Sequence, residues 1–159
     1  MRNWHSMAML ALFVVICLAV SGAGALFTSP SVRQWYPMLQ KPSWTPPSWI
    51  FGPVWTVLYL MMAAAAWLVW SRRGSADIRG ALVLFFIQLV LNAAWSPLFF
   101  GLRNPLAGLL DIVPLWAFIA ATLMAFWKIF PAAGALLVPY WLWVSFATAL
   151  NFALWRMNR

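Results

Sequence analysis

Long runs of apolar residues, separated by short polar or proline-rich segments, dominate the pattern of this chain. The runs lie at about 6–27, 50–70, 80–101, 106–130 and 134–155. Because a helix needs about 20 apolar residues to cross a bilayer core, we predict an all-α membrane protein with five transmembrane helices. These helices would form one domain over residues 1–159, with a long ordered loop at 28–49. The short later connections predict an up-and-down bundle of the second to fifth helices, in which sequence neighbours are antiparallel.

The first apolar run also has the features of a signal peptide. Arg2 precedes an apolar core, and the small residues SGAGA follow it, with an A-x-A-like end at Ala23-Gly24-Ala25. The run is longer than a typical signal-peptide core, which favours a membrane span. The sequence alone leaves both interpretations open.

The composition supports a lipid environment. Hydrophobic residues make up 65% of the chain, charged residues only 8%, and the mean hydropathy is +0.87. A protein this apolar needs an apolar environment around it as well as an apolar core, so we expect a multi-pass integral membrane protein. The net charge of +8 fits contact with anionic headgroups. No basic cluster exceeds Arg72-Arg73, which argues against nucleic-acid binding.

The distribution of basic residues does not decide the orientation in the membrane. Five lysines or arginines fall on each side of the predicted bundle, so the positive-inside rule gives no answer. The short chain without an extra targeting segment favours a bacterial cell membrane.

Polar side chains within the third and fourth runs need internal partners. Gln88, Asn92, Trp95 and Phe99 recur every three to four residues, which places them on one helix face. Amides are costly against lipid, so this face should point into the bundle, either to join helices or to bind a ligand. Asp111 lies near a helix end, where a structural hydrogen bond is favoured over a proton relay.

The second and fifth runs carry similar faces. Trp55 and Tyr59 share a face of the second run, and Tyr140, Trp143, Ala147 and Asn151 share a face of the fifth. Three helices would thus each contribute aromatic and amide groups. A concave apolar cavity with a few convergent polar groups is the usual form of a small-molecule site, and we predict such a site here.

Several classes of chemistry lack the residues that they need. The chain has one cysteine and one histidine, and it has no Ser-His-Asp set or glycine-rich phosphate loop. We therefore expect no metal site and no required cofactor. Hydrolase and metalloenzyme functions are disfavoured.

The segment KPSWTPPSW, at 41–49, cannot continue a helix. Its prolines fix their φ angles and push the residues before them toward extended conformations. The segment is either a stiff lid over a cavity or a rigid turn between the first two helices. In the lid interpretation Pro46 reaches the cavity wall, while Lys41, Pro42, Trp44 and Pro47 form the lid.

Three blocks of sequence resemble a known family. WYPMLQKPSWTPPSWIFGPVWTVLY, QLVLNAAWSPLFFG and VPYWLWVSFATALNFALWR occur in the order and spacing of the translocator protein family, also called the tryptophan-rich sensory protein or peripheral-type benzodiazepine receptor family. The resemblance covers nearly the whole chain. It implies five transmembrane helices, homodimers, and binding of porphyrins, haem, sterols in some members, and synthetic benzodiazepine-type ligands.

The resemblance also implies which residues line the cavity. Carried over by motif, they are Tyr36, Pro46, Phe51, Trp55, Tyr59, Asn92, Trp95, Trp143 and Ala147; helical spacing adds Gln88, Phe99 and Asn151. Some bacterial members degrade porphyrins in light, and Trp55 and Trp143 match the tryptophans implicated there. One departure is Phe152, which stands where the proposed cholesterol motif has tyrosine and puts sterol recognition in doubt.

Three functions remain after this comparison. The first is a receptor or transporter-like protein for tetrapyrroles, in which indole rings stack on the macrocycle and Arg33 or Lys41 pairs with its carboxylates. The second is a light-dependent porphyrin-degrading enzyme that uses Trp55 or Trp143. The third is a regulatory or structural membrane partner protein.

Overall fold

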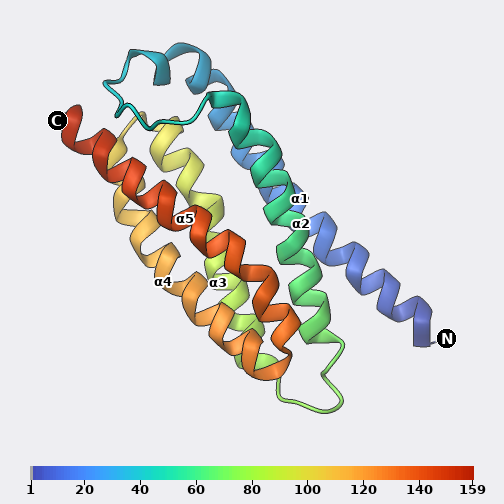
Figure 1. Ribbon diagram of the computed structural model, residues 1–159. Coiled ribbons are helices and arrows are strands. Elements are labelled where there is room, and N and C mark those ends of the chain that lie inside the picture. The colour runs from blue at the N-terminus through green and yellow to red at the C-terminus, as the bar shows by residue number, and fades with distance from the viewer. Residues whose placement is uncertain (1) are drawn as a thin grey trace.

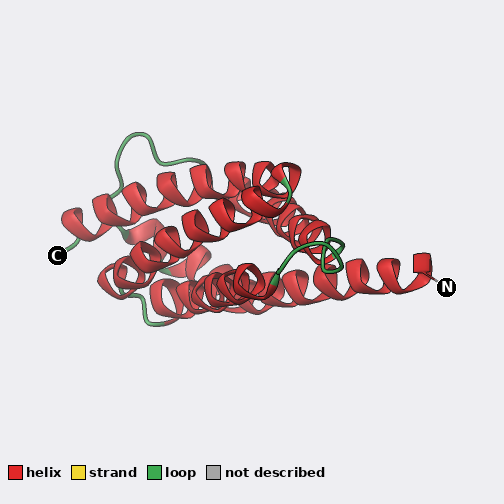
Figure 2. Ribbon diagram, turned by 90° about the horizontal axis from the view of Figure 1, so that it is seen from below, coloured by secondary structure: helices red, strands yellow, loops and turns green. Residues whose placement is uncertain are grey.

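The computed structural model describes residues 2–159, and these form five long helices with short connections (Figure 1). The helices are α1 (Arg2–Gln34), α2 (Phe51–Trp70), α3 (Arg79–Ser96), α4 (Pro105–Ile129) and α5 (Pro131–Met157). Two 3₁₀ turns, η1 (Tyr36–Met38) and η2 (Ser48–Ile50), lie between α1 and α2, and a π-helical turn, η3 (Pro97–Gly101), extends α3. All five helices are long and apolar enough to cross a membrane. The predicted all-α, five-span fold is confirmed, and no strand occurs in residues 2–159 (Figure 2).

The five helices pack as a closed ring rather than in sequence order. α1 packs on α2 and α3, α2 packs on α5, α5 on α4, and α4 on α3. The order of the helices around the ring is therefore α1, α2, α5, α4, α3. α2 and α3 follow one another in sequence but are not adjacent in this ring. The 71–78 connection is long enough to carry the chain across the end of the bundle.

α1 is longer than its apolar run and is part of the bundle. Phe13 and Cys17 are buried in the main core, which favours a membrane span over a signal peptide. The helix continues to Gln34, so the expected loop at 28–49 begins only after that residue. The Ser31 hydroxyl donates to the Phe100 carbonyl at 2.7 Å, which ties the end of α1 to η3. The first turns of α1 extend away from the other helices (Figure 1).

A chain of buried hydrogen bonds joins α2, α3 and α5 in the middle of the bundle. The Tyr59 hydroxyl donates to Asn92 Oδ1 at 2.6 Å, and Asn92 Nδ2 donates to the Tyr140 hydroxyl at 2.6 Å. Tyr140 donates in turn to Gln88 Oε1 at 2.8 Å. Each of these four residues is at most 6% exposed. Because lipid offers no hydrogen bonds, this chain fixes the relative rotation of three helices.

Asp111 does not make the structural hydrogen bond that the sequence favoured. It is 8% exposed, and its Oδ2 atom has no hydrogen-bond partner among residues 2–159.

α4 approaches η3 and α5 closely at Gly108. A Cβ atom there would lie 2.8 Å from Phe99 Cδ2, 2.9 Å from Phe99 Cβ and 3.0 Å from Asn151 Oδ1. Only glycine therefore allows α4 to sit against η3 and α5 at this level. Both neighbours also line the cavity described below.

We expect Gly108→Ala to lower the free energy of unfolding by about 1–3 kcal/mol, because the added methyl group overpacks the contact with Phe99. The measurement is thermal unfolding of the detergent-purified protein, followed by circular dichroism. Gly22→Ala is the control, since a Cβ atom there meets nothing within 4 Å. Equal melting temperatures for the two variants would contradict the close approach.

Candidate functional site

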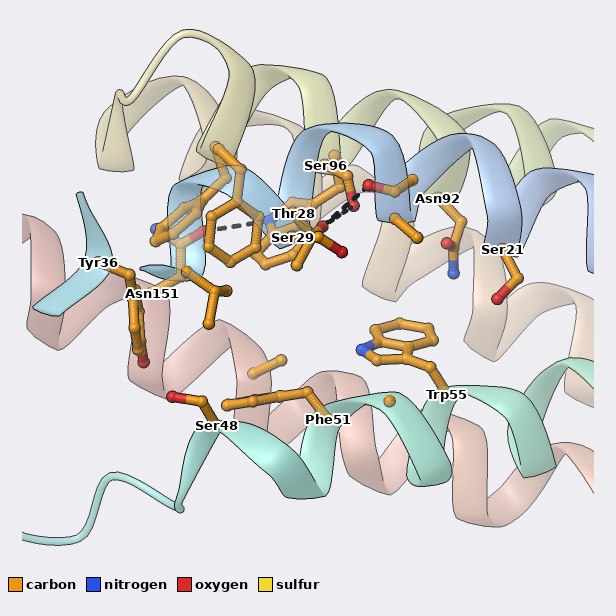
Figure 3. Close-up of a pocket in the computed structure, with 18 of the residues that line it drawn as sticks. Ser21, Thr28, Ser29, Tyr36, Ser48, Phe51, Trp55, Asn92, Ser96 and Asn151 are labelled. Atoms are coloured by element: carbon orange, nitrogen blue, oxygen red, sulfur yellow. Dashed lines mark hydrogen bonds between the residues drawn. The ribbon is translucent and has the colours of Figure 1, made fainter. Parts of the chain in front are cut away.

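A cavity of about 500 Å³ lies between α1, α2, α3 and α5, in the half of the bundle that holds the 35–47 connection (Figure 3). This volume is within the range of small-molecule sites. α4 contributes no lining residue. The two sides of the cavity differ in chemistry, and this difference defines the site.

Aromatic rings form the inner wall. Trp95 and Phe99 are stacked with their ring centroids 5.0 Å apart and their planes at 17°. Phe51 on α2 and Trp143 on α5 meet edge-to-face at 6.0 Å. Small side chains such as Ala147 leave room beside these rings. The wall can therefore hold a flat apolar molecule by stacking and by burial of its faces.

Hydroxyl groups form the outer edge, where α1 faces the start of α2. Ser21, Ser29 and Ser48 line the cavity, and their hydroxyls make no hydrogen bond within residues 2–159. Figure 3 shows Ser48 near Tyr36 at one end of the cavity and Ser21 beside Asn92 at the other. These hydroxyls are therefore free to bond a polar group of a ligand.

One cation, Arg33, also lies on this edge, because the last turn of α1 carries it to the cavity. Its guanidinium has no acidic partner, since the chain has only two acidic residues and the structure contains no ion pair among residues 2–159. Asp77 lies in the connection at the opposite end of the bundle, and Asp111 lies in α4. The free guanidinium suits a carboxylate ligand.

The amides at the inner wall are already satisfied by the protein. Asn92 belongs to the buried chain with Tyr59 and Tyr140. Asn151 Oδ1 accepts from Trp95 Nε1 at 3.2 Å, and Asn151 Nδ2 donates to the Pro105 carbonyl at 2.7 Å. These bonds hold the Trp95 ring in place. The amides therefore act mainly as supports for the aromatic wall.

The Lys41 side chain folds back on the connection above the cavity and holds its first residues together. Its ammonium donates to the carbonyl oxygens of Tyr36, Pro37 and Leu39 at 2.8, 3.1 and 2.9 Å. An ammonium has three protons, so none remains for a ligand. Burial raises the pKa of the Tyr36 phenol, a cavity-lining group, above its usual value.

Most of the residues singled out from the sequence come together around the cavity. The lining includes Tyr36, Phe51, Trp55, Tyr59, Asn92, Trp95, Phe99, Trp143, Ala147 and Asn151. Pro46 and Gln88 do not line it: Pro46 is half-buried in the connection, and Gln88 lies deeper, bonded to Tyr140. The lid residues Lys41, Pro42, Trp44 and Pro47 also lie outside the lining.

Apart from Arg33, sequence reasoning missed the α1 side of the cavity. Ser21, Gly24, Thr28 and Val32 line it at helical spacing. The same spacing is visible in the sequence, but Thr28 and Val32 fell within the expected 28–49 loop, and Ser21 and Gly24 were assigned only to the first span. The Ser48 hydroxyl was missed because it lies next to a run of prolines.

Comparisons with known proteins show the family of this chain. The sequence model of the TspO/MBR family matches residues 13–156. The chain is 48% identical to "Tryptophan-rich protein TspO" of Chlorobaculum tepidum, over 94% of this chain and 95% of the relative. It is 39% identical to "Tryptophan-rich sensory protein" of Cereibacter sphaeroides, over 95% and 92% of the two chains. It is 42% identical to the human "Translocator protein", over 85% and 81%. A five-helix membrane fold with this coverage and identity leads to one conclusion: the chain belongs to the TspO/MBR family.

Proposed function

We propose that this protein binds tetrapyrroles, such as protoporphyrin and haem, in the cavity between α1, α2, α3 and α5. One observation carries the proposal: an aromatic wall faces an edge of free hydroxyls and an unpaired arginine. A tetrapyrrole has a matching division, with a large flat π-system and two carboxylates on one side. Other flat apolar ligands would use the wall alone.

The division of the cavity gives the ligand an orientation. The apolar edge of the ring faces Trp95, Phe99 and Trp143, where the amides of Asn92 and Asn151 are already bonded within the protein. The propionates face the outer edge, where Arg33 and the hydroxyls of Ser29 and Ser48 lack partners. Lys41 does not contribute, since its three protons are bonded to main-chain carbonyls.

A light-dependent reaction of the bound ring is a second candidate function. Trp55 and Trp143 both line the cavity, so an indole can contact the ring of a bound porphyrin from either of two helices. Trp55 lies 5.7 Å from Tyr59 between ring centroids. In this reaction dioxygen would oxidise the excited porphyrin, and no metal or acid–base pair is required.

Binding predicts saturable quenching of tryptophan fluorescence by protoporphyrin. Trp143→Phe should weaken the affinity by about threefold to tenfold, since the smaller ring loses part of the stacking contact. Trp127→Phe is the control, because Trp127 is exposed near the far end of α4 and does not line the cavity. Quenching that does not saturate in the wild type would contradict binding and favour a regulatory or structural role.

The proposed orientation predicts that Arg33 recognises the carboxylates. Arg33→Gln should weaken binding of protoporphyrin by about threefold to tenfold, through loss of a partly exposed charge-assisted contact. It should leave the affinity for protoporphyrin dimethyl ester unchanged. Arg156→Gln, at the same end of the bundle but outside the cavity, controls for net charge. An equal loss for acid and ester would contradict this orientation.

Specific photochemistry predicts a dependence on Trp55. Under illumination in air, the Soret band of bound protoporphyrin should decay several-fold more slowly in Trp55→Phe than in the wild type. The decay is followed by absorbance at equal occupancy of the site, with Trp127→Phe as control. Equal decay rates would leave binding as the function and remove the enzymatic candidate.

A further inference from the structure

The 35–47 connection crosses the end of the bundle above the cavity, and its first part is a rigid unit. Lys41 bonds three carbonyls in the preceding five residues, including those of Tyr36 and Leu39. The Lys41 Nζ atom also lies 5.2 Å from the centroid of the Tyr36 ring. Because Tyr36 lines the cavity, any movement of this unit moves part of the cavity wall. We call residues 36–41 the lid unit.

The lid unit is attached to the far end of the chain by one side chain. The Gln40 backbone N–H donates to Asn158 Oδ1 at 2.9 Å, and Asn158 Nδ2 donates back to the Gln40 carbonyl at 2.9 Å. Among residues 2–159, no other hydrogen bond joins residues 37–47 to a distant segment. The nearby Trp44 adds an edge-to-face contact with Phe146 at 5.7 Å, but it remains half exposed.

The Asn158 amide is held in position by α5. Its Nδ2 atom also donates to the Leu154 carbonyl at 2.8 Å, and the Asn158 backbone N–H bonds the same carbonyl at 3.1 Å. Carbonyls at a helix C-terminus otherwise lack partners. Asn158 therefore bonds a carbonyl in the last turn of α5 and pairs with Gln40 at the same time. Leu154, one turn earlier, is buried and lines the cavity.

We propose that Asn158 is a positioning residue that latches the lid unit to α5 and so sets how fast a ligand leaves the cavity. The inference rests on the proposed function, because it takes a tetrapyrrole as the ligand. Asn158 itself does not line the cavity, so it acts through Gln40 and Tyr36. Opening the latch breaks two hydrogen bonds at an exposed position. It moves Tyr36 away from the Phe100 ring but leaves the main core between the helices in place.

The test is the dissociation rate of protoporphyrin from protein in lipid nanodiscs. Pre-loaded protein is mixed with excess empty vesicles, and recovery of tryptophan fluorescence is followed. Asn158→Ala should release protoporphyrin about tenfold faster, as expected for loss of two neutral hydrogen bonds. Its melting temperature should stay within a degree or two of the wild type. Asn158→Asp keeps the acceptor for the Gln40 N–H but loses the donor, and it should release the ligand at an intermediate rate.

Two controls separate a latch from a general loss of stability. Gln40→Ala keeps both main-chain groups that Asn158 contacts, and it should leave the rate unchanged. Asn104→Ala removes the N-cap of α4, whose side chain accepts from the backbone N–H groups of Leu106 and Ala107. This variant should lower the melting temperature without changing the dissociation rate. A wild-type rate in Asn158→Ala, or an equal acceleration in Asn104→Ala, would overturn the proposal.

A ligand-free measurement distinguishes failure of the latch from failure of the proposed function. Hydrogen exchange of peptides covering 36–47 should be at least several-fold faster in Asn158→Ala than in the wild type, with no porphyrin present. Faster exchange without any porphyrin binding would reject tetrapyrroles and retain the latch. Unchanged exchange would reject the latch, whatever the protein binds.

Discussion

The cost of leaving polar groups unpaired in the absence of water organises this structure, and in residues 2–159 only Asp111 Oδ2 and Trp141 Nε1 remain as buried side-chain atoms without a partner. In hydrocarbon an unpaired amide or hydroxyl is costly, so polar side chains inside the bundle must find one another. The chain from Tyr59 through Asn92 and Tyr140 to Gln88 does this for α2, α3 and α5. Because these bonds require one rotation of each helix, they also decide which side chains face the cavity. Trp55 lies one turn from Tyr59, and Trp143 lies one turn from Tyr140.

The same constraint explains the two-sided character of the cavity. Amides on the inner side hydrogen-bond to other protein groups and hold the aromatic wall in place, as Asn151 does for Trp95. Hydroxyls on the outer side, at Ser29 and Ser48, are left free. Lys41, which has no acidic neighbour, is satisfied by main-chain carbonyls. Arg33 is thus the one basic residue that lines the described cavity.

Much of this arrangement can be read from the sequence, because amides and large aromatic residues recur at the helical period. That period places Trp55, Asn92 and Trp143 on inward faces, where the structure also has them. The helical period does not distinguish residues that line the cavity from residues buried behind them. For that reason Gln88 was predicted to line the cavity. Gln88 lies below the cavity because its side chain accepts a hydrogen bond from Tyr140, which is 52 residues away in sequence.

Other features depend on tertiary contacts that local sequence does not contain. Ser31 and Pro30 indicated a loop, but α1 continues through them and Ser31 bonds the Phe100 carbonyl. The ring order of helices is set by packing, so the 71–78 connection alone did not indicate that α2 lies beside α5. Gln40 and Asn158 are 118 residues apart in sequence. Their pairing uses the main-chain groups of Gln40, so the side chain of Gln40 gives no sign of it.

The proposed function requires that a tetrapyrrole occupies the cavity between α1, α2, α3 and α5. Photoaffinity labelling tests it most directly, with a diazirine derivative of protoporphyrin and peptide mapping by mass spectrometry. If a tetrapyrrole occupies the cavity, labels fall within 21–36, 48–59, 92–100 and 143–154, the segments that line it, and are lost when unlabelled protoporphyrin competes. Labels confined to outward-facing residues such as Val83, Val90 and Leu110, without competition, would contradict it.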